Sequence, residues 1–215
     1  MTQALRDELV ATARRMSELG LCPGTSGNAS VRLHTDGGFL VTPSGMPYDQ
    51  LSADDLVAID LDGTIHPDQR VPSTEWRLHR DLYAARPDAH AIVHTHSPYC
   101  TTVACLRRAI PAIHYMIVLA GSDEIPCADY ATYGTPELAA AVVRALGFGR
   151  ACLMANHGMV ALGDTLPAAL SLASEIEVLA AHYWRAVQLG PPHILTADEL
   201  DAVRHQYASY GQLRR

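Results

Sequence analysis

Residues 89–98 read Ala-His-Ala-Ile-Val-His-Thr-His-Ser-Pro. The largely apolar opening predicts a buried strand over 89–94. Ser97-Pro98 then predicts a helix start, with serine at the N-cap and proline at the first helical position. Because alternate residues of a strand share a side, His94 and His96 send their imidazoles to the same face, where both can reach one ion.

A third histidine follows another apolar run. Residues 151–155 predict a buried strand, and His157-Gly158 comes next in a tight turn where glycine lets the backbone approach closely. With His94 and His96, this gives three neutral imidazoles and leaves a fourth tetrahedral position open, which is typical of a catalytic zinc site. The His-x-His spacing also arises by chance among 11 histidines, so a core role stays open.

The other histidines show no comparable spacing. They are assigned structural or surface roles: His34, His66, His79, His90, His114, His182, His193 and His205.

Glu75 follows Val71-Pro-Ser-Thr74, where a helix over 74–85 is expected to begin. A helix N-terminus favours a carboxylate, so capping is its ordinary role. A carboxylate near three histidines can instead close the open coordination position and act as a general base when substrate displaces it.

The basic residues are all arginine: the combined Lys+Arg count is 16, and lysine does not occur. This excludes Schiff-base aldolases, pyridoxal phosphate enzymes and P-loop nucleotide hydrolases, each of which needs a lysine amine. A formal charge of -7 also argues against partners that require a basic face, namely nucleic acid and anionic membranes.

The chain of 215 residues with 48% hydrophobic content predicts one domain over 1–215. Its N-terminus has no basic region followed by an apolar one, and no apolar run approaches the roughly 20 residues of a spanning helix, so we expect a cytoplasmic protein.

Helical and strand-like segments alternate irregularly, with a hairpin early in the chain. Helices are predicted over 3–19, 74–85, 135–146, 167–189 and 196–210, and strands over 28–34, 39–42, 56–60, 89–94 and 151–155. This order favours a mixed or mainly antiparallel sheet covered by helices over a parallel doubly wound fold.

Glycine- and hydroxyl-rich pieces recur upstream of the histidines, at Gly24-Thr-Ser-Gly-Asn28, Thr42-Pro-Ser-Gly45 and Ser73-Thr74. Backbone N–H groups of such turns, together with hydroxyls, bind phosphate without lysine. Taken singly, each is an ordinary turn.

These pieces resemble, in order and spacing, the class II aldolases of the fuculose-phosphate aldolase, ribulose-phosphate epimerase and adducin superfamily. The matching segments are Gly24–Ser30, Thr42–Met46, Ser73–Arg77, His94–His96, Ile125–Cys127 and Asn156–Gly158. The resemblance covers the chain from about residue 5 to its end and is closest to the L-fuculose-phosphate aldolases.

The resemblance implies a three-layer α/β/α fold with a mainly antiparallel sheet, and a homotetramer with active sites between subunits. It implies one Zn²⁺ per subunit, held by His94, His96 and His157 with Glu75 nearby. It assigns the substrate phosphate to Gly27, Asn28, Ser44, Gly45, Ser73 and Thr74.

The implied reaction cleaves a ketose 1-phosphate such as L-fuculose 1-phosphate into dihydroxyacetone phosphate and a small aldehyde such as L-lactaldehyde. Zinc acts as the Lewis acid while Glu75 moves a proton. Tyr115 and Tyr210 match tyrosines that handle the aldehyde end, with Tyr210 entering a neighbour's site.

Two alternatives stay open. One is a metal-dependent epimerase or dehydratase of a related ketose phosphate, such as L-ribulose 5-phosphate or methylthioribulose 1-phosphate; Leu119, where the epimerases carry an acid-base aspartate, argues against the epimerase. The other is a non-catalytic adducin-like interaction module, which has no need of three metal ligands and a carboxylate. Ser122-Asp123-Glu124, Thr74 and Tyr133 depart from the aldolase pattern.

Overall fold

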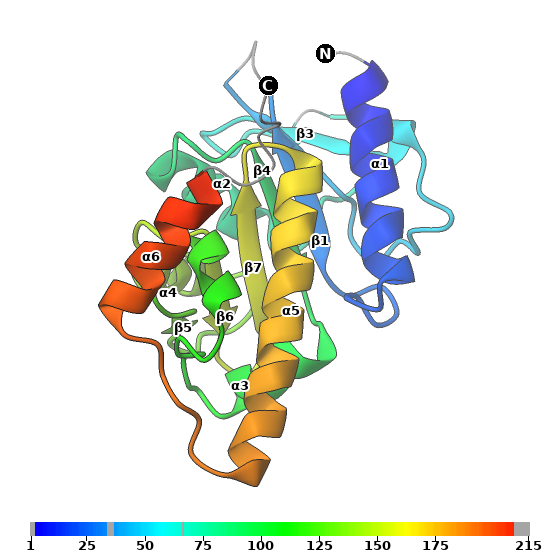
Figure 1. Ribbon diagram of the computed structural model, residues 1–215. Coiled ribbons are helices and arrows are strands. Elements are labelled where there is room, and N and C mark those ends of the chain that lie inside the picture. The colour runs from blue at the N-terminus through cyan, green and yellow to red at the C-terminus, as the bar shows by residue number, and fades with distance from the viewer. Residues whose placement is uncertain (1–2, 34–36, 66, 209–215) are drawn as a thin grey trace.

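The central strand of the molecule is β4, Ala91–Thr95, which lies in the middle of a seven-stranded sheet of order β3-β2-β1-β4-β7-β6-β5 (Figure 1). The computed structural model describes residues 3–33, 37–65 and 67–208. Tyr210, His34 and His66 lie outside these ranges.

The remaining strands are β1 Asn28–Arg32, β2 Phe39–Val41, β3 Val57–Ile59, β5 Cys127–Ala128, β6 Ala151–Met154 and β7 Gly158–Gly163. The α-helices are α1 Gln3–Glu18, α2 Trp76–Ala85, α3 Pro98–Cys105, α4 Pro136–Leu146, α5 Leu166–Leu189 and α6 Ala197–Ala208. Two 3₁₀ helices, η1 Ala53–Asp55 and η2 Tyr115–Ala120, complete the described elements.

Every pairing between these strands is antiparallel except that of β5 with β6. The predicted fold class is therefore confirmed: a mainly antiparallel sheet lies between two layers of helices. No helix in the described part of the chain is long and apolar enough to cross a membrane.

The sheet has two apolar faces, and alternate residues of β4 point to opposite ones. Ala91 and Val93 belong to the core shared with α1, α3 and α5, whereas Ile92 belongs to the core shared with α2 and α4. Continuing the alternation places His94 on the α2 side. The first ligand of the predicted pair is thus directed by the strand that centres the fold.

The predicted helices agree with the structure to within two residues at each described end. The sequence did not predict β7, whose six residues are all buried. Its run Gly-Met-Val-Ala-Leu-Gly shows no alternation of polar and apolar residues because both of its faces are covered. The sequence predicts a turn at Gly158, which is the first residue of this strand.

Ser97 precedes α3 as predicted, but its side chain makes no capping hydrogen bond. Glu177 of α5 caps the helix instead, because its two carboxylate oxygens accept hydrogen bonds from the N–H groups of Tyr99 and Cys100, each at 2.8 Å. The carboxylate thereby ties α5 to the segment that follows His96.

We expect Glu177→Gln to lower the free energy of unfolding by about 1–2 kcal/mol, because it removes the charge and one of two acceptors at the α3 N-terminus. Urea denaturation of the metal-free protein measures this change. Glu8→Gln, an exposed change on α1, serves as the control. Equal midpoints for the two variants would contradict the capping role.

Candidate metal centre and substrate cavity

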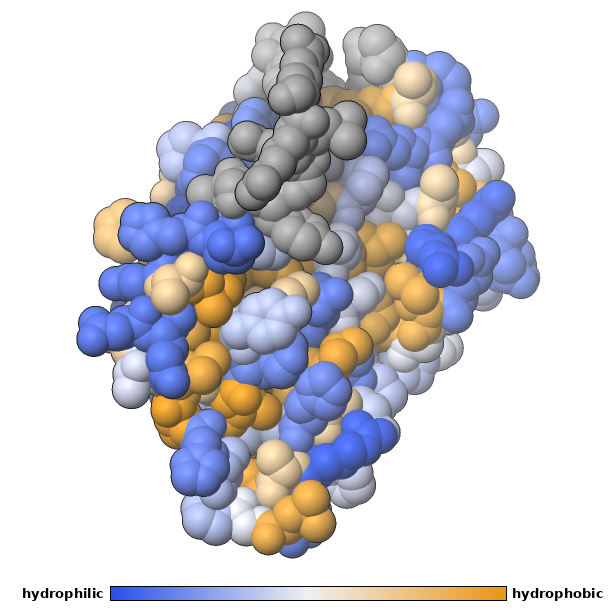
Figure 2. Space-filling model, in the orientation of Figure 1, coloured by the Kyte–Doolittle hydropathy of each residue, from blue (hydrophilic) through white to orange (hydrophobic). Residues whose placement is uncertain are grey.

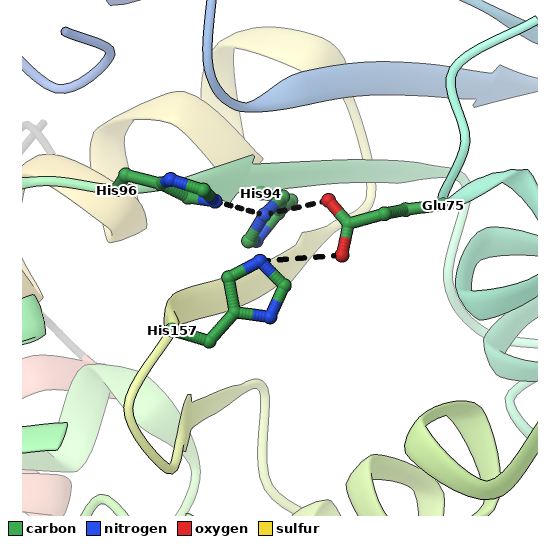
Figure 3. Close-up of side chains that lie close together, drawn as sticks. All are labelled: Glu75, His94, His96 and His157. Carbon is green, nitrogen blue, oxygen red and sulfur yellow. Dashed lines mark hydrogen bonds and ion pairs between the residues drawn. The ribbon is translucent and has the colours of Figure 1, made fainter. Parts of the chain in front are cut away.

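Four side chains from three parts of the chain converge at one end of the sheet (Figure 3). His94 is the penultimate residue of β4 and His96 lies just beyond its end, His157 lies in the turn between β6 and β7, and Glu75 directly precedes α2. Their potential ligand atoms all lie within 4.8 Å of one another. The structure therefore brings together the four residues predicted to form the metal site.

The contacts within this cluster are short. His94 Nε2 lies 3.0 Å from both His96 Nε2 and Glu75 Oε2, and His157 Nε2 lies 3.3 Å from Glu75 Oε1. The centroids of the three imidazole rings are 4.7–4.9 Å apart. Figure 3 shows the rings and the carboxylate facing a common centre.

Two observations fit a cation at that centre. His94 Nδ1 donates to the Met159 carbonyl oxygen at 2.9 Å, so Nε2 is the ring nitrogen that faces the cluster and offers a lone pair once its own proton is displaced. Glu75 Oε1 is buried and has no hydrogen-bond partner. An acceptor lone pair and an orphaned carboxylate oxygen at one buried point are both satisfied by a bound metal ion.

The cluster sets the protonation states of its members. Burial raises the pKa of Glu75, but the imidazoles of His94 and His157 and the hydrogen bonds to the carboxylate outweigh burial and hold that pKa far below its usual range. Burial lowers the pKa of His94, yet the adjacent carboxylate raises it above normal. Burial and the neighbouring imidazoles lower the pKa of His96 to about 3 and that of His157 to about 4.

Glu75 occupies the N-cap position of α2 but makes no side-chain capping hydrogen bond. Of the two roles that the sequence left open, capping is therefore wrong, because the carboxylate turns toward the imidazoles instead.

The turn that carries His157 depends on its two neighbours. Asn156 adopts φ of 55°, and its side-chain oxygen accepts a hydrogen bond from Arg107 Nε at 2.8 Å. Gly158 packs so tightly against the Thr95 carbonyl that a Cβ would overlap it. The close approach predicted for this glycine is what brings β7 beside β4.

A cavity of about 390 Å³ opens beside the cluster. All the residues predicted for phosphate line it: Gly27, Asn28, Ser44, Gly45, Ser73 and Thr74. No arginine is among the described residues that line this cavity. An anion in this cavity would therefore have to be held by N–H groups, hydroxyls and an amide.

Gly27 shows why the loop over 24–28 needs glycine. Its φ is 79°, and a Cβ would lie 2.8 Å from the carbonyl oxygen of His94. The Tyr48 hydroxyl donates to the Gly27 carbonyl at 2.8 Å. This loop is therefore held against the strand that carries His94.

Two predicted residues are not part of the cavity. Tyr115, at the start of η2, is 50% exposed and packs on His114, and it does not line the cavity of its own chain. Tyr210 lies outside the described residues. Conversely, the cavity includes Tyr130 and Ala131, to which the sequence analysis assigned no role. Its remaining lining residues come from the predicted phosphate-binding turns (Thr25, Ser26 and Pro43), from the motif that contains His157 (Asn156), and from a departure from the aldolase pattern (Tyr133).

The cluster beside this cavity has the ligand types that could hold a metal ion. Residues 7–184 match the family described as Class II Aldolase and Adducin N-terminal domain, and the chain belongs to that family.

The chain is 48% identical over 208 residues to the 5-methylthioribulose-1-phosphate/5-deoxyribulose-1-phosphate aldolase of Rhodospirillum rubrum, covering 97% of this chain and 93% of that protein. It is 44% identical to the L-fuculose phosphate aldolase of Escherichia coli K12, with coverages of 96% and 95%. A solved L-fuculose 1-phosphate aldolase superposes with a TM-score of 0.93 at 36% identity, covering 97% of this chain and 98% of that one. The resemblance expected from the motifs is confirmed.

His96→Ala is expected to abolish stoichiometric zinc binding, because it removes one of three imidazole ligands. Metal analysis after zinc loading and gel filtration measures the content per chain. His193→Ala removes an exposed histidine and should bind zinc as the unaltered protein does. Full zinc retention in His96→Ala would show that the ion sits elsewhere.

Zinc binding should release a proton near neutral pH. Burial and neighbouring charges keep His96 and His157 neutral and Glu75 ionised, whereas the raised pKa of His94 leaves a proton there for the metal to displace. Affinity should then fall as the pH falls and His94 becomes more fully protonated. Calorimetry in two buffers of different ionisation enthalpy measures the release, and none at any pH would contradict this assignment.

Proposed function

We propose that this chain is a zinc-dependent aldolase that cleaves a ketose 1-phosphate of the L-fuculose 1-phosphate kind. The products would be dihydroxyacetone phosphate and a short aldehyde such as L-lactaldehyde. The observation that carries the proposal is the orphaned Glu75 Oε1 beside three imidazoles, in a cavity lined by uncharged phosphate-binding groups.

Zinc suits the donor set, since three imidazoles and one carboxylate are ligands that this metal prefers. We assign one ion per subunit to His94, His96 and His157, with Glu75 able to occupy the remaining position. A zinc ion held there would supply Lewis acidity to the oxygens of the substrate.

The phosphate would be held by the hydroxyls of Ser44, Ser73 and Thr74, the amide of Asn28, and N–H groups at Gly27 and Gly45. Anchoring this end of the substrate fixes the position of the carbons next to it. Glu75 borders the same cavity, so the three-carbon half of the sugar can reach its carboxylate.

Cleavage moves two protons. One leaves the hydroxyl that becomes the aldehyde oxygen, and one is added to the carbon that becomes part of dihydroxyacetone phosphate. We assign the second transfer to Glu75, whose Oε1 has no hydrogen-bond partner. We assign the aldehyde end to Tyr115 and Tyr210.

These tyrosine roles require neighbouring subunits, and we propose a homotetramer with active sites between them. Tyr115 is half exposed and away from the cavity of its own chain, which suits a residue that serves a neighbour's site. Hydrophobic patches are also visible on the face that carries α5 and α6 (Figure 2).

A second candidate is the cleavage of 5-deoxyribulose 1-phosphate or 5-methylthioribulose 1-phosphate. It is favoured by the 48% identity to the R. rubrum aldolase, against 44% to the E. coli fuculose-phosphate enzyme. Both substrates would yield dihydroxyacetone phosphate and differ only in the aldehyde. These relatives favour aldol cleavage over the epimerase or dehydratase, and over the adducin-like module.

Incubating the zinc-loaded protein with L-fuculose 1-phosphate and, separately, with 5-deoxyribulose 1-phosphate tests the proposal. Dihydroxyacetone phosphate should form from at least one substrate and stop when a chelator is added. Glu75→Gln should retain zinc on its three imidazoles but lose about 100-fold or more in kcat, because it cannot exchange a proton. Glu8→Gln serves as the control. The proposal fails if neither sugar yields product, and the role of Glu75 fails if its variant stays active.

A further inference from the structure

A chain of polar side chains runs behind the cavity, between β1 and α2. It contains Asn28 and Ser30 of β1, which alternate with the buried apolar residues Ala29 and Val31. Opposite them, α2 and its N-cap place Glu75, His79 and Tyr83 at intervals of four residues.

The two spacings match. Two residues along a strand advance about 6.6 Å, and four residues along a helix advance about 6 Å, so successive strand side chains meet successive helix side chains. Asn28, Ser30, His79 and Tyr83 are all at most 3% exposed. Burying this polar seam, the row of side chains between β1 and α2, costs free energy of folding unless each group has a hydrogen-bond partner.

Each group does find one. Tyr83 OH lies 2.8 Å from Ser30 Oγ, and Ser30 Oγ lies 2.6 Å from His79 Nδ1. His79 Nε2 contacts Asn28 Oδ1. Asn28 Nδ2 then donates to Ser73 Oγ at 2.9 Å and to Glu75 Oε2 at 3.1 Å.

The acceptors at the cavity end fix the direction of the whole chain. The Glu75 carboxylate can only accept, so Asn28 must present its NH₂ group there and its carbonyl oxygen to His79. His79 Nε2 must then carry a proton. Burial lowers the pKa of His79 to about 3, so the ring is neutral and its Nδ1 accepts from Ser30, which in turn accepts from Tyr83.

We propose that His79 is a positioning residue of the aldolase site, which acts by holding the Asn28 amide in the orientation that serves both Glu75 and Ser73. This inference rests on the function proposed above. His79 does not line the cavity, and its hydrogen bond toward the site goes to Asn28. In the opposite amide orientation, the Asn28 oxygen would face the carboxylate, and its NH₂ group would face the His79 N–H.

The covalent structures of glutamine and asparagine provide matched variants. The terminal nitrogen of glutamine is three bonds beyond Cβ, as His79 Nε2 is, so His79→Gln can still donate to Asn28. The terminal atoms of asparagine are two bonds beyond Cβ, as His79 Nδ1 is, so His79→Asn keeps the Ser30 end and loses the Asn28 end. Tyr83→Phe removes a hydrogen bond from the far end of the same chain.

Calorimetry with inorganic phosphate on the metal-free proteins, and steady-state kinetics on the zinc-loaded ones, separate positioning from stability. We expect His79→Asn to lose roughly 10- to 100-fold in kcat and to bind phosphate more weakly, with zinc content retained. His79→Gln should recover most of both losses, and Tyr83→Phe should remain near the unaltered protein. Equal losses in His79→Gln and His79→Asn, or none in His79→Asn, would overturn the proposal.

A spectroscopic readout needs no variant to fold and no activity. In ¹⁵N-histidine spectra of the metal-free protein, His79 should be a neutral ring protonated at Nε2 at neutral pH. A ring protonated at Nδ1 would overturn the proposal even if His79→Asn does not fold. Because phosphate binding and the spectrum do not depend on aldol cleavage, a protein without aldolase activity would sink the proposed function and leave these two results to decide the role of His79.

Discussion

A negative charge placed inside the protein is the constraint on which the site depends. The Glu75 side chain is only 7% exposed, and a buried carboxylate costs several kcal/mol unless charge and hydrogen bonds compensate it. His94 and Asn28 contact Oε2 of this carboxylate, while Oε1 faces His157 without a hydrogen bond. The carboxylate is therefore anchored on one side and available on the other, which suits the metal-binding and proton-transfer roles that we propose for it.

Strand register supplies these partners. Asn28 of β1 lies directly opposite His94 of β4, and Met159 of β7 lies opposite Thr95. The Met159 carbonyl fixes the His94 ring, and the Asn28 amide holds the carboxylate that the same ring contacts. Shifting the register of either strand by one residue would turn these groups to the opposite face. The geometry of the site therefore depends on the register with which the central strands pair.

The sequence predicted the parts of this arrangement that depend on local periodicity. The alternation of His94 and His96, the helices and the glycine turns each follow from spacing within one segment. The hydrogen bond between His79 and Asn28 joins residues 51 positions apart, and Glu177 caps α3 from 77–78 positions away. No local pattern encodes such pairings. One signal was available for the seam behind the cavity: Asn28 and Ser30 are polar at alternate positions of a strand that is otherwise apolar, opposite a helix with polar residues four apart.

The family resemblance predicted more of the site than periodicity did, because it relates separate segments of the chain to one substrate. It grouped the three histidines with Glu75, which the structure brings into one cluster, and the predicted phosphate-binding turns, which line the cavity beside that cluster. The resemblance alone did not predict every residue that folding brings to the cavity, and Tyr130 is an example. A second property of the cavity follows from its composition. Because no arginine lines the described wall, a substrate phosphate would share this space with the Glu75 carboxylate and no arginine. Their mutual repulsion would have to be offset by N–H dipoles and by a cation held by the imidazoles. In the function that we propose, metal binding and substrate binding are thereby coupled through charge, in a protein whose own formal charge is -7.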